Sequence, residues 1–272
     1  MIFILILIII MALYLYMISP RIIGKADLTM FQKKYFAHRG MHHFQDDIPE
    51  NSMAAIKKAV EMGFGIEMDI QLTKDKELVV FHDDSLLRMC GTKGRVGDYS
   101  YDELQQFTLE QTEYKIPLFT EVLNVVDGKV PLIIEIKAYR EAFELAKQAN
   151  EILKGYRGEY CVEAFHPGVL LWYRLHNKKV ARGQLSSCFQ KDGEKEGISL
   201  FLVRHLLLNF VGKPDFIAYN HKHMGAVSRT ICEKLYRVCG AAWTITSKEA
   251  LEKAKDHFDV FIFERFIPDE NI

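Results

Sequence analysis

The feature that most constrains the fold is an alternation of short apolar runs and amphipathic segments that begins at Tyr35. Near-continuous apolar strands that alternate with helices are typical of a parallel sheet covered on both faces. Eight such units in about 235 residues predict a (β/α)8 barrel rather than an open sheet. The expected strands are 35–38, 65–72 with a β-hairpin return at 78–82, 132–137, 160–165, 179–185, 216–219, 241–245 and 260–263.

Helical periodicity lies between these strands. No glycine-rich phosphate or dinucleotide fingerprint follows the first strand, which argues against a nucleotide-binding sheet. The segment 186–212 is longer than a usual crossover, and we expect a lid or a surface helix there. Few residues follow the last strand, so the eighth helix is expected to be short or absent. Helices are expected near 52–62, 120–126, 141–153, 167–176, 226–238 and 247–255.

The first eighteen residues carry no charged side chain and are mostly Ile, Leu, Met, Phe and Tyr. This stretch predicts an uncleaved, single-pass transmembrane helix over 1–18. A cleaved signal peptide fits less well, because no basic region precedes the stretch and no small-residue cleavage site follows it. Residues 19–34 are then a juxtamembrane linker and 35–272 the barrel domain. Basic residues follow the span and none precedes it, which predicts that the domain is cytoplasmic.

Charge and cysteine content exclude two classes of function. A formal net charge of −1 argues against a nucleic-acid partner, because nucleic-acid binders are usually basic. The five cysteines show no ligand-like spacing and are expected to be reduced packing residues. Nothing in the sequence predicts a protein partner.

Candidate functional residues cluster at the expected carboxyl ends of the strands, where barrels form their sites. With a two-residue loop at Asp75–Lys76, Asp69 would face His82 across the hairpin. Each polar residue alone is more often a packing or solvated side chain, but together they favour one site. They are His38, Arg39, Glu67, Asp69, His82, Glu135 and Lys137, with Trp243 on the seventh strand.

Three of these residues, Glu67, Asp69 and Glu135, are carboxylates that would lie within a few ångströms of one another. A like-charged pair about 4 Å apart repels by roughly 4 kcal/mol at an effective dielectric constant near 20. Such a group is stable when it is protonated or when it holds a cation. Because the donors are all oxygen, the sequence predicts a hard divalent cation, Ca²⁺ or Mg²⁺.

The basic residues beside these carboxylates suit a phosphate group. Arg39 can bind two phosphate oxygens at once, and Lys137 adds a point charge. His38 and His82, on different strand ends, can divide the proton transfers between attacking and leaving oxygens. The residues therefore predict phosphoryl chemistry on an ester with an alcohol leaving group.

A series of short motifs runs through the first half of the barrel: His-Arg-Gly at 38–40, Pro-Glu-Asn-Ser at 49–52, Ile-Glu-Met-Asp at 66–69, Val-Val-Phe-His-Asp at 79–83 and Ile-Glu-Ile-Lys at 134–137. These motifs resemble those of the glycerophosphodiester phosphodiesterases, which are TIM barrels. The resemblance implies hydrolysis of glycerophosphodiesters to an alcohol and sn-glycerol 3-phosphate, with attack by water or by a substrate hydroxyl. The implied roles are metal ligation by Glu67, Asp69 and Glu135, acid–base catalysis by His38 and His82, phosphate binding by Arg39 and Lys137, and support by Glu50 and Asn51.

The chain departs from the family pattern at 164–167, 243–246 and 263–268, on the substrate side of the mouth. These departures leave the choice of diester open, and Trp243 is expected to stack on glycerol, to flank a lipid or to pack at the mouth. A water-soluble glycerophosphodiester is the default substrate. The predicted anchor suggests a lipid instead, either a lysophospholipid cleaved in the manner of phospholipase D or phosphatidylglycerol. A membrane-tethered binding protein without turnover is the remaining alternative.

Overall fold

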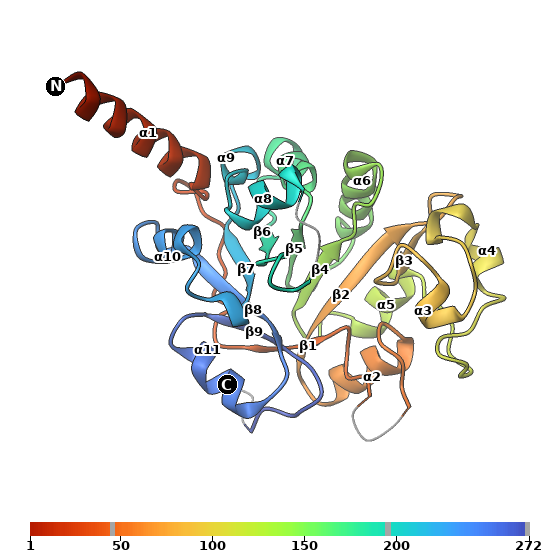
Figure 1. Cartoon of the computed structure of the whole chain (residues 1–272). Coiled ribbons are helices and arrows are strands. Elements are labelled where there is room, and N and C mark those ends of the chain that lie inside the picture. The colour runs from red at the N-terminus through yellow and green to blue at the C-terminus, as the bar shows by residue number, and fades with distance from the viewer. Residues whose placement is uncertain (44–46, 194–196, 270–272) are drawn as a thin grey trace.

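Strand β1 pairs with both β2 and β9, so the parallel sheet closes into a barrel (Figure 1). The computed structural model describes residues 1–43, 47–193 and 197–269. Its eight barrel strands confirm the predicted (β/α)8 architecture. They are β1 (Tyr35–His38), β2 (Gly65–Leu72), β4 (Leu132–Ile136), β5 (Tyr160–Ala164), β6 (Arg182–Ser186), β7 (Phe216–Asn220), β8 (Cys239–Ile245) and β9 (Val260–Phe263).

Helices surround the barrel close to the predicted positions: α2 (Met53–Glu61), α5 (Phe119–Val126), α6 (Ala142–Leu153), α7 (Pro167–His176), α10 (Val227–Lys234) and α11 (Lys248–Lys255). The long 186–212 connection contains α8 (Ile198–Arg204) and α9 (Asn209–Gly212), while residues 194–196 within it lie outside the described residues. Up to residue 269, no helix follows β9. Between β3 (Leu78–Val80) and α5 lie the short helices α3 (Leu87–Cys90) and α4 (Tyr101–Leu104) and the 3₁₀ turn η1 (Val96–Asp98). The 3₁₀ turn η2 (His221–His223) follows β7.

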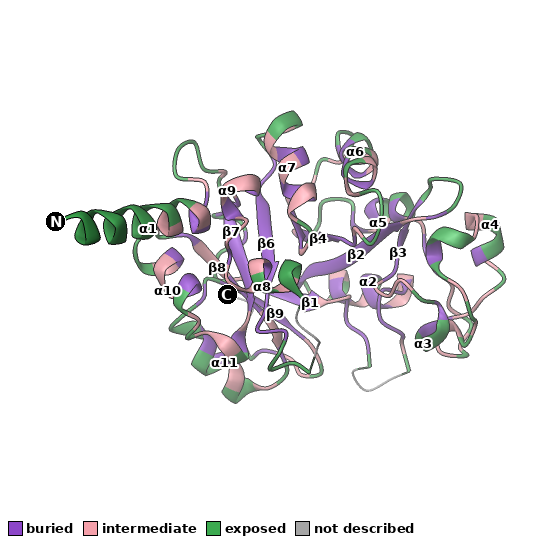
Figure 2. Cartoon of the chain, turned by 45° about the horizontal axis from the view of Figure 1, so that its top comes forward, coloured by how far each residue is buried: buried purple, intermediate pink, exposed green. Residues whose placement is uncertain are grey.

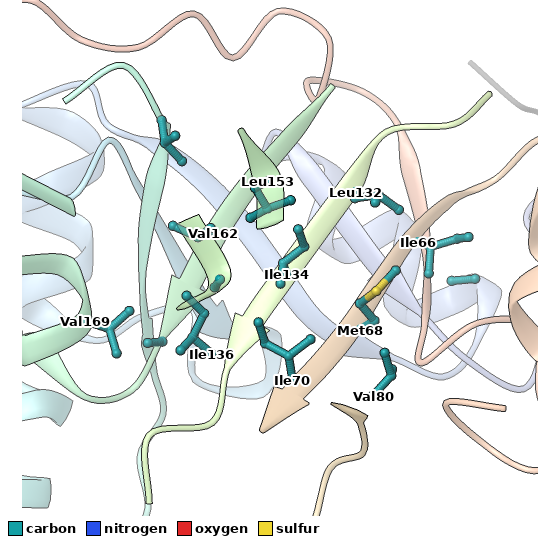
Figure 3. Close-up of a cluster of buried hydrophobic side chains, with 14 of the residues drawn as sticks. Ile66, Met68, Ile70, Val80, Leu132, Ile134, Ile136, Leu153, Val162 and Val169 are labelled. Atoms are coloured by element: carbon teal, nitrogen blue, oxygen red, sulfur yellow. The ribbon is translucent and has the colours of Figure 1, made fainter. Parts of the chain in front are cut away.

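The two faces of β2 have different environments because strand side chains alternate. Ile66, Met68 and Ile70 point outward into the layer between strands and helices, where they pack with apolar side chains of β4 (Figure 3). Each such fully buried side chain contributes roughly 1.5–3 kcal/mol to stability. Glu67 and Asp69 therefore point into the barrel, which is what places two carboxylates at the site.

An apolar floor closes the lower barrel interior, with Phe36 and Phe216 among its buried side chains. Glycine is required beside both rings. A Cβ atom on Gly65 would lie 2.6 Å from the Phe36 ring, and one on Gly183 would lie 2.2 Å from the Phe216 ring. The floor fills the interior at this level, so polar chemistry is confined to the mouth.

The hairpin formed by β2 and β3 (Leu78–Val80) has a register one residue away from the predicted one. Gln71 pairs with Val79, and the Phe81 amide donates to the Asp69 carbonyl over 2.9 Å. Asp69 therefore faces Phe81 rather than His82, and that prediction is wrong. The physical reason is a longer turn, closed by a hydrogen bond from the Thr73 amide to the Glu77 carbonyl.

The N-terminal apolar stretch forms helix α1 (Ile2–Ile18), which projects from the barrel and is exposed along most of its length (Figures 1 and 2). Seventeen residues reach only about 25 Å, short of a hydrocarbon layer about 30 Å thick. The last turn is also held on the barrel, where Asn209 Nδ2 donates to the Ile18 carbonyl over 3.0 Å.

Within the described residues, no helix combines the length and apolar character needed to cross a bilayer. The predictions of a single-pass transmembrane helix over 1–18 and of a membrane location through it are therefore wrong, and the cytoplasmic orientation inferred from that span is withdrawn with them.

Residues 19–34, predicted as a linker, lie along the amino-terminal end of the barrel. The Arg21 amide donates to the Pro214 carbonyl and the Ala26 amide to Asp215 Oδ1, each over 2.9 Å. Phe31 is buried and stacks on Phe36 with a ring-centroid distance of 5.9 Å. This segment therefore extends the apolar floor from below.

Candidate active site

Strand register brings the predicted carboxylates to one level of the barrel mouth. His38 lies beside Glu67 across β1 and β2, and Asp69 lies beside Glu135 across β2 and β4. Oxygens of Glu67, Asp69 and Glu135 lie within 4.8 Å of one another, and all three residues are buried. Glu163 follows Glu135 in the register, on β5.

The pKa values of these three acids show that the nearby basic side chains do not fully balance their negative charges. Burial and the neighbouring Asp69 and Glu135 raise the pKa of Glu67 well above its ordinary value. Burial likewise raises the pKa of Glu135. Burial acts most strongly and would raise the pKa of Asp69, but the surrounding positive charges, with Lys137 the largest and Arg39 among the others, together hold that pKa below the ordinary value. A divalent cation would allow all three groups to be ionised together.

Buried side-chain oxygens that accept no hydrogen bond lie among these acids and also indicate a cation site. Within the described residues, buried Asn51 Oδ1 and Glu163 Oε2 accept no hydrogen bond, and Asp69 Oδ1 has an ion pair with Lys137 but no hydrogen bond. Buried oxygens without donors are costly, and a cation satisfies several at once. An all-oxygen donor set of this kind fits a hard ion such as Ca²⁺ or Mg²⁺.

Basic side chains lie directly against these acids. Lys137 Nζ lies 2.8 Å from Glu135 Oε1 and 3.2 Å from Asp69 Oδ1. Arg39 Nε lies 3.3 Å from Asp69 Oδ2, and its Nη1 donates to Glu50 Oε1 over 2.7 Å. Asn51 Nδ2 donates to Asp69 Oδ2 over 2.8 Å. Glu50 and Asn51 thus lie where they can orient Arg39 and Asp69.

Each candidate catalytic histidine pairs through Nδ1 with a carboxylate. His38 Nδ1 lies 2.8 Å from Glu264 Oε2, and His82 Nδ1 lies 2.6 Å from Asp83 Oδ1. Because a carboxylate is only an acceptor, the proton of neutral His38 lies on Nδ1 and its Nε2, 3.9 Å from Glu67 Oε2, is free to accept one. Burial and the nearby Arg39 lower the pKa of His38 to about 4, with Glu264 acting in the opposite direction.

These groups border a cavity of about 80 Å³ whose wall is divided into a polar and an apolar half. Phe165 and Trp243 meet edge to face in the apolar half, with ring centroids 5.7 Å apart. The buried Trp243 Nε1 has no hydrogen-bond partner among the described residues. The polar half contains His38, Arg39, Glu67, His82, Glu135, Lys137 and Glu163.

The structure thus brings every predicted site residue to this mouth, with Glu50, Asn51 and Asp69 just behind the cavity wall. Sequence reasoning missed Glu163 and the pairing of Asp83 with His82. An isolated acid in the apolar strand 160–164 was the available signal for Glu163. The contact between Glu264 and His38 carried no sequence signal, because 226 positions separate the two residues.

Comparison with known proteins agrees with this geometry. Residues 38–221 match the model of the Glycerophosphoryl diester phosphodiesterase family, which is more than half of the chain. The chain belongs to the glycerophosphoryl diester phosphodiesterase family. The family resemblance inferred from the motifs is therefore confirmed.

Relatives within the glycerophosphoryl diester phosphodiesterase family include bacterial and animal proteins. A glycerophosphodiester phosphodiesterase of Bacillus altitudinis is 36% identical over 52% of this chain and 62% of its own length. Lysophospholipase D GDPD1 of Homo sapiens is 30% identical over 52% of this chain and 47% of its own length. The chain spans about half the length of the curated relatives it matches.

A solved structure shows that the fold is shared beyond the aligned sequence. It is an Oleispira antarctica phosphodiesterase in complex with the product sn-glycerol-3-phosphate, with a TM-score of 0.67 and 22% identity. The match covers 86% of this chain and 93% of that one. At this identity the likeness supports the barrel fold of the glycerophosphoryl diester phosphodiesterase family, including its carboxyl-terminal half.

Proposed function

We propose that the chain hydrolyses glycerophosphodiesters to an alcohol and sn-glycerol 3-phosphate, with residues 35–272 as the catalytic domain. The observation that carries the proposal is the convergence of two histidine–carboxylate pairs on one cluster of buried acids. Family membership agrees with this chemistry.

Glu67, Asp69 and Glu135 would hold the divalent cation, which supplies Lewis-acid stabilisation of charge on the phosphate oxygens. Arg39 and Lys137 line the same cavity and would bind the phosphate oxygens. The side chains of Arg39 and Lys137 are already oriented by Glu50 and Glu135, so little reorganisation is needed when the substrate binds.

Proton transfer is assigned to the two histidines. His38 is neutral at neutral pH because its pKa is about 4, so its Nε2 accepts the proton of the attacking hydroxyl, from water or from the substrate. His82 donates a proton to the leaving alcohol oxygen, and Asp83 Oδ1 contacts the Nδ1 atom of its ring. Glu264 and Asp83 hold the two rings in these orientations.

A soluble glycerophosphodiester is the first substrate class for the proposed reaction. A lysophospholipid is the second candidate, favoured by the relative named lysophospholipase D and by the apolar half of the cavity, where Trp243 and Phe165 lie. Phosphatidylglycerol is a third test substrate.

The deciding experiment measures alcohol release from soluble and lipid diesters, in EDTA and after return of Ca²⁺ or Mg²⁺. We expect turnover only with a cation, and a loss of about 100-fold or more in His38→Ala and in His82→Ala. His257→Ala, which changes an exposed histidine just after the end of α11, is the matched control. Ligand binding without turnover in the wild-type protein would support a binding protein instead.

A further inference from the structure

A second cavity, of about 170 Å³, lies next to the candidate active site and shares Lys137 with it. It lies between the β2–β3 hairpin and the loop that leads from β4 to α6. Its lining carries five cationic side chains and two carboxylates, Asp84 and Glu141. The cations are Lys74, Lys76, Arg95, Lys137 and Arg140.

The carboxylates do not neutralise this cavity. Lys76 pairs with Glu141, and Arg95 Nε lies 3.3 Å from Asp84 Oδ2, so both lining carboxylates are already engaged. Lys137 is held by acids of the candidate active site. In the described ranges, the two remaining cations, Lys74 and Arg140, form no ion pair.

Two unpaired positive groups therefore border one cavity. Because Lys74 and Arg140 line the same cavity, an anion bound there would be attracted to both. An Arg–Lys combination suits a phosphate, since guanidinium binds two oxygens and ammonium supplies a point charge.

The wall between the two cavities contains the proposed acid of the reaction. Tyr139 lines the second cavity, and its hydroxyl donates to the His82 carbonyl over 3.0 Å. His82 lines the first cavity and would protonate the leaving alcohol. In the proposed reaction the leaving alcohol would therefore lie on the side of the active site that adjoins the second cavity.

We infer that this second cavity binds a phosphate group carried by the leaving alcohol. The inference rests on the proposed function and defines a substrate class: glycerophosphodiesters whose alcohol bears a second phosphate. Lys74 and Arg140 act in selecting this substrate and do not touch the scissile bond.

The test compares glycerophosphoglycerol with the same diester carrying a terminal phosphate on the second glycerol. We expect the wild-type protein to favour the phosphate-bearing diester by about tenfold in kcat/KM, as expected for two screened ion pairs at the edge of a cavity. The Lys74→Ala/Arg140→Ala variant should lose that preference through KM, while its kinetics on glycerophosphoglycerol change less than about twofold. Lys57→Ala/Lys253→Ala removes the same charge from the exposed faces of α2 and α11 and should keep the preference.

Equal kcat/KM values for the two diesters in the wild-type protein would overturn the inference, as would loss of the preference in the control variant. Calorimetric binding of both diesters in EDTA separates this outcome from failure of the proposed function. If neither diester is hydrolysed, tighter binding of the phosphate-bearing diester that disappears only in Lys74→Ala/Arg140→Ala still supports the site. Equal binding of both diesters rejects it.

Discussion

His38 Nδ1 lies 2.8 Å from Glu264 Oε2, which joins the end of the first barrel strand to the end of the last. Glu264 stands where the family motif has a different sequence, and this contact gives it a role. It fixes which His38 nitrogen faces the cavity, so we regard Glu264 as a positioning residue for the proposed base.

Replacing Glu264 by Ala should lower kcat by about 10–100-fold, because His38 loses the acceptor that orients it. Glu264→Gln should recover much of this loss, since the amide oxygen still accepts from Nδ1. The negative Glu264 raises the pKa of His38, so both variants should move the acid limb of kcat/KM to lower pH. Exposed Glu249→Ala is the control, and unchanged kcat in Glu264→Ala would contradict the assignment.

Glu163 offers a test of the cation site that does not depend on activity. Burial and the neighbouring Glu135 raise its pKa well above the ordinary value, so at neutral pH this carboxyl destabilises the cation-free protein. Glu163→Gln should therefore stabilise the protein in EDTA by about 1 kcal/mol and reduce the increase in Tm caused by Ca²⁺. The measurement is thermal unfolding with and without Ca²⁺, with exposed Glu151→Gln as the control. A wild-type Ca²⁺ response in Glu163→Gln would exclude Glu163 from the site.

Glu50 should make stability depend on acidity. Although burial acts to raise its pKa, hydrogen bonds and charge from Arg88 and Arg39 lower it from 4.5 to about 2. Because the folded-state pKa is depressed, the stabilisation is fully present above pH 4.5 and is lost as pH falls towards 2. Allowing for solvent screening at half-exposed Arg88, the loss is about 2 kcal/mol.

The contribution of Glu50 to stability is measured by urea unfolding of the wild-type protein and of Glu50→Gln, from neutral pH down towards pH 2. The variant should be less stable than wild type at neutral pH and approach it in acid. A constant difference in the free energy of unfolding across this pH range would show that Glu50 does not titrate as described.

The sequence alone determined which strand faces are polar. Along 66–70, apolar and acidic residues alternate, and a strand has only two faces, so Glu67 and Asp69 had to share one. The same local regularity placed Glu135 at a strand end and predicted the barrel.

The local sequence pattern did not determine the register of the hairpin or the length of the N-terminal helix. The hairpin register moved by one residue because Thr73 and Glu77 close a longer turn, and the apolar stretch at the N-terminus formed a helix of only seventeen residues. Both outcomes depend on hydrogen bonds and packing that residue types alone do not specify.

Tertiary structure also decided which side chains meet across the barrel. His38 meets Glu264 because β1 pairs with β9, and Glu163 lies beside Glu135 because β4 pairs with β5. Tyr139 lies against His82, beside the cationic second cavity. Periodicity is a property of neighbouring residues and can be read from sequence, whereas these contacts exist only once the sheet has closed and joined distant strand ends.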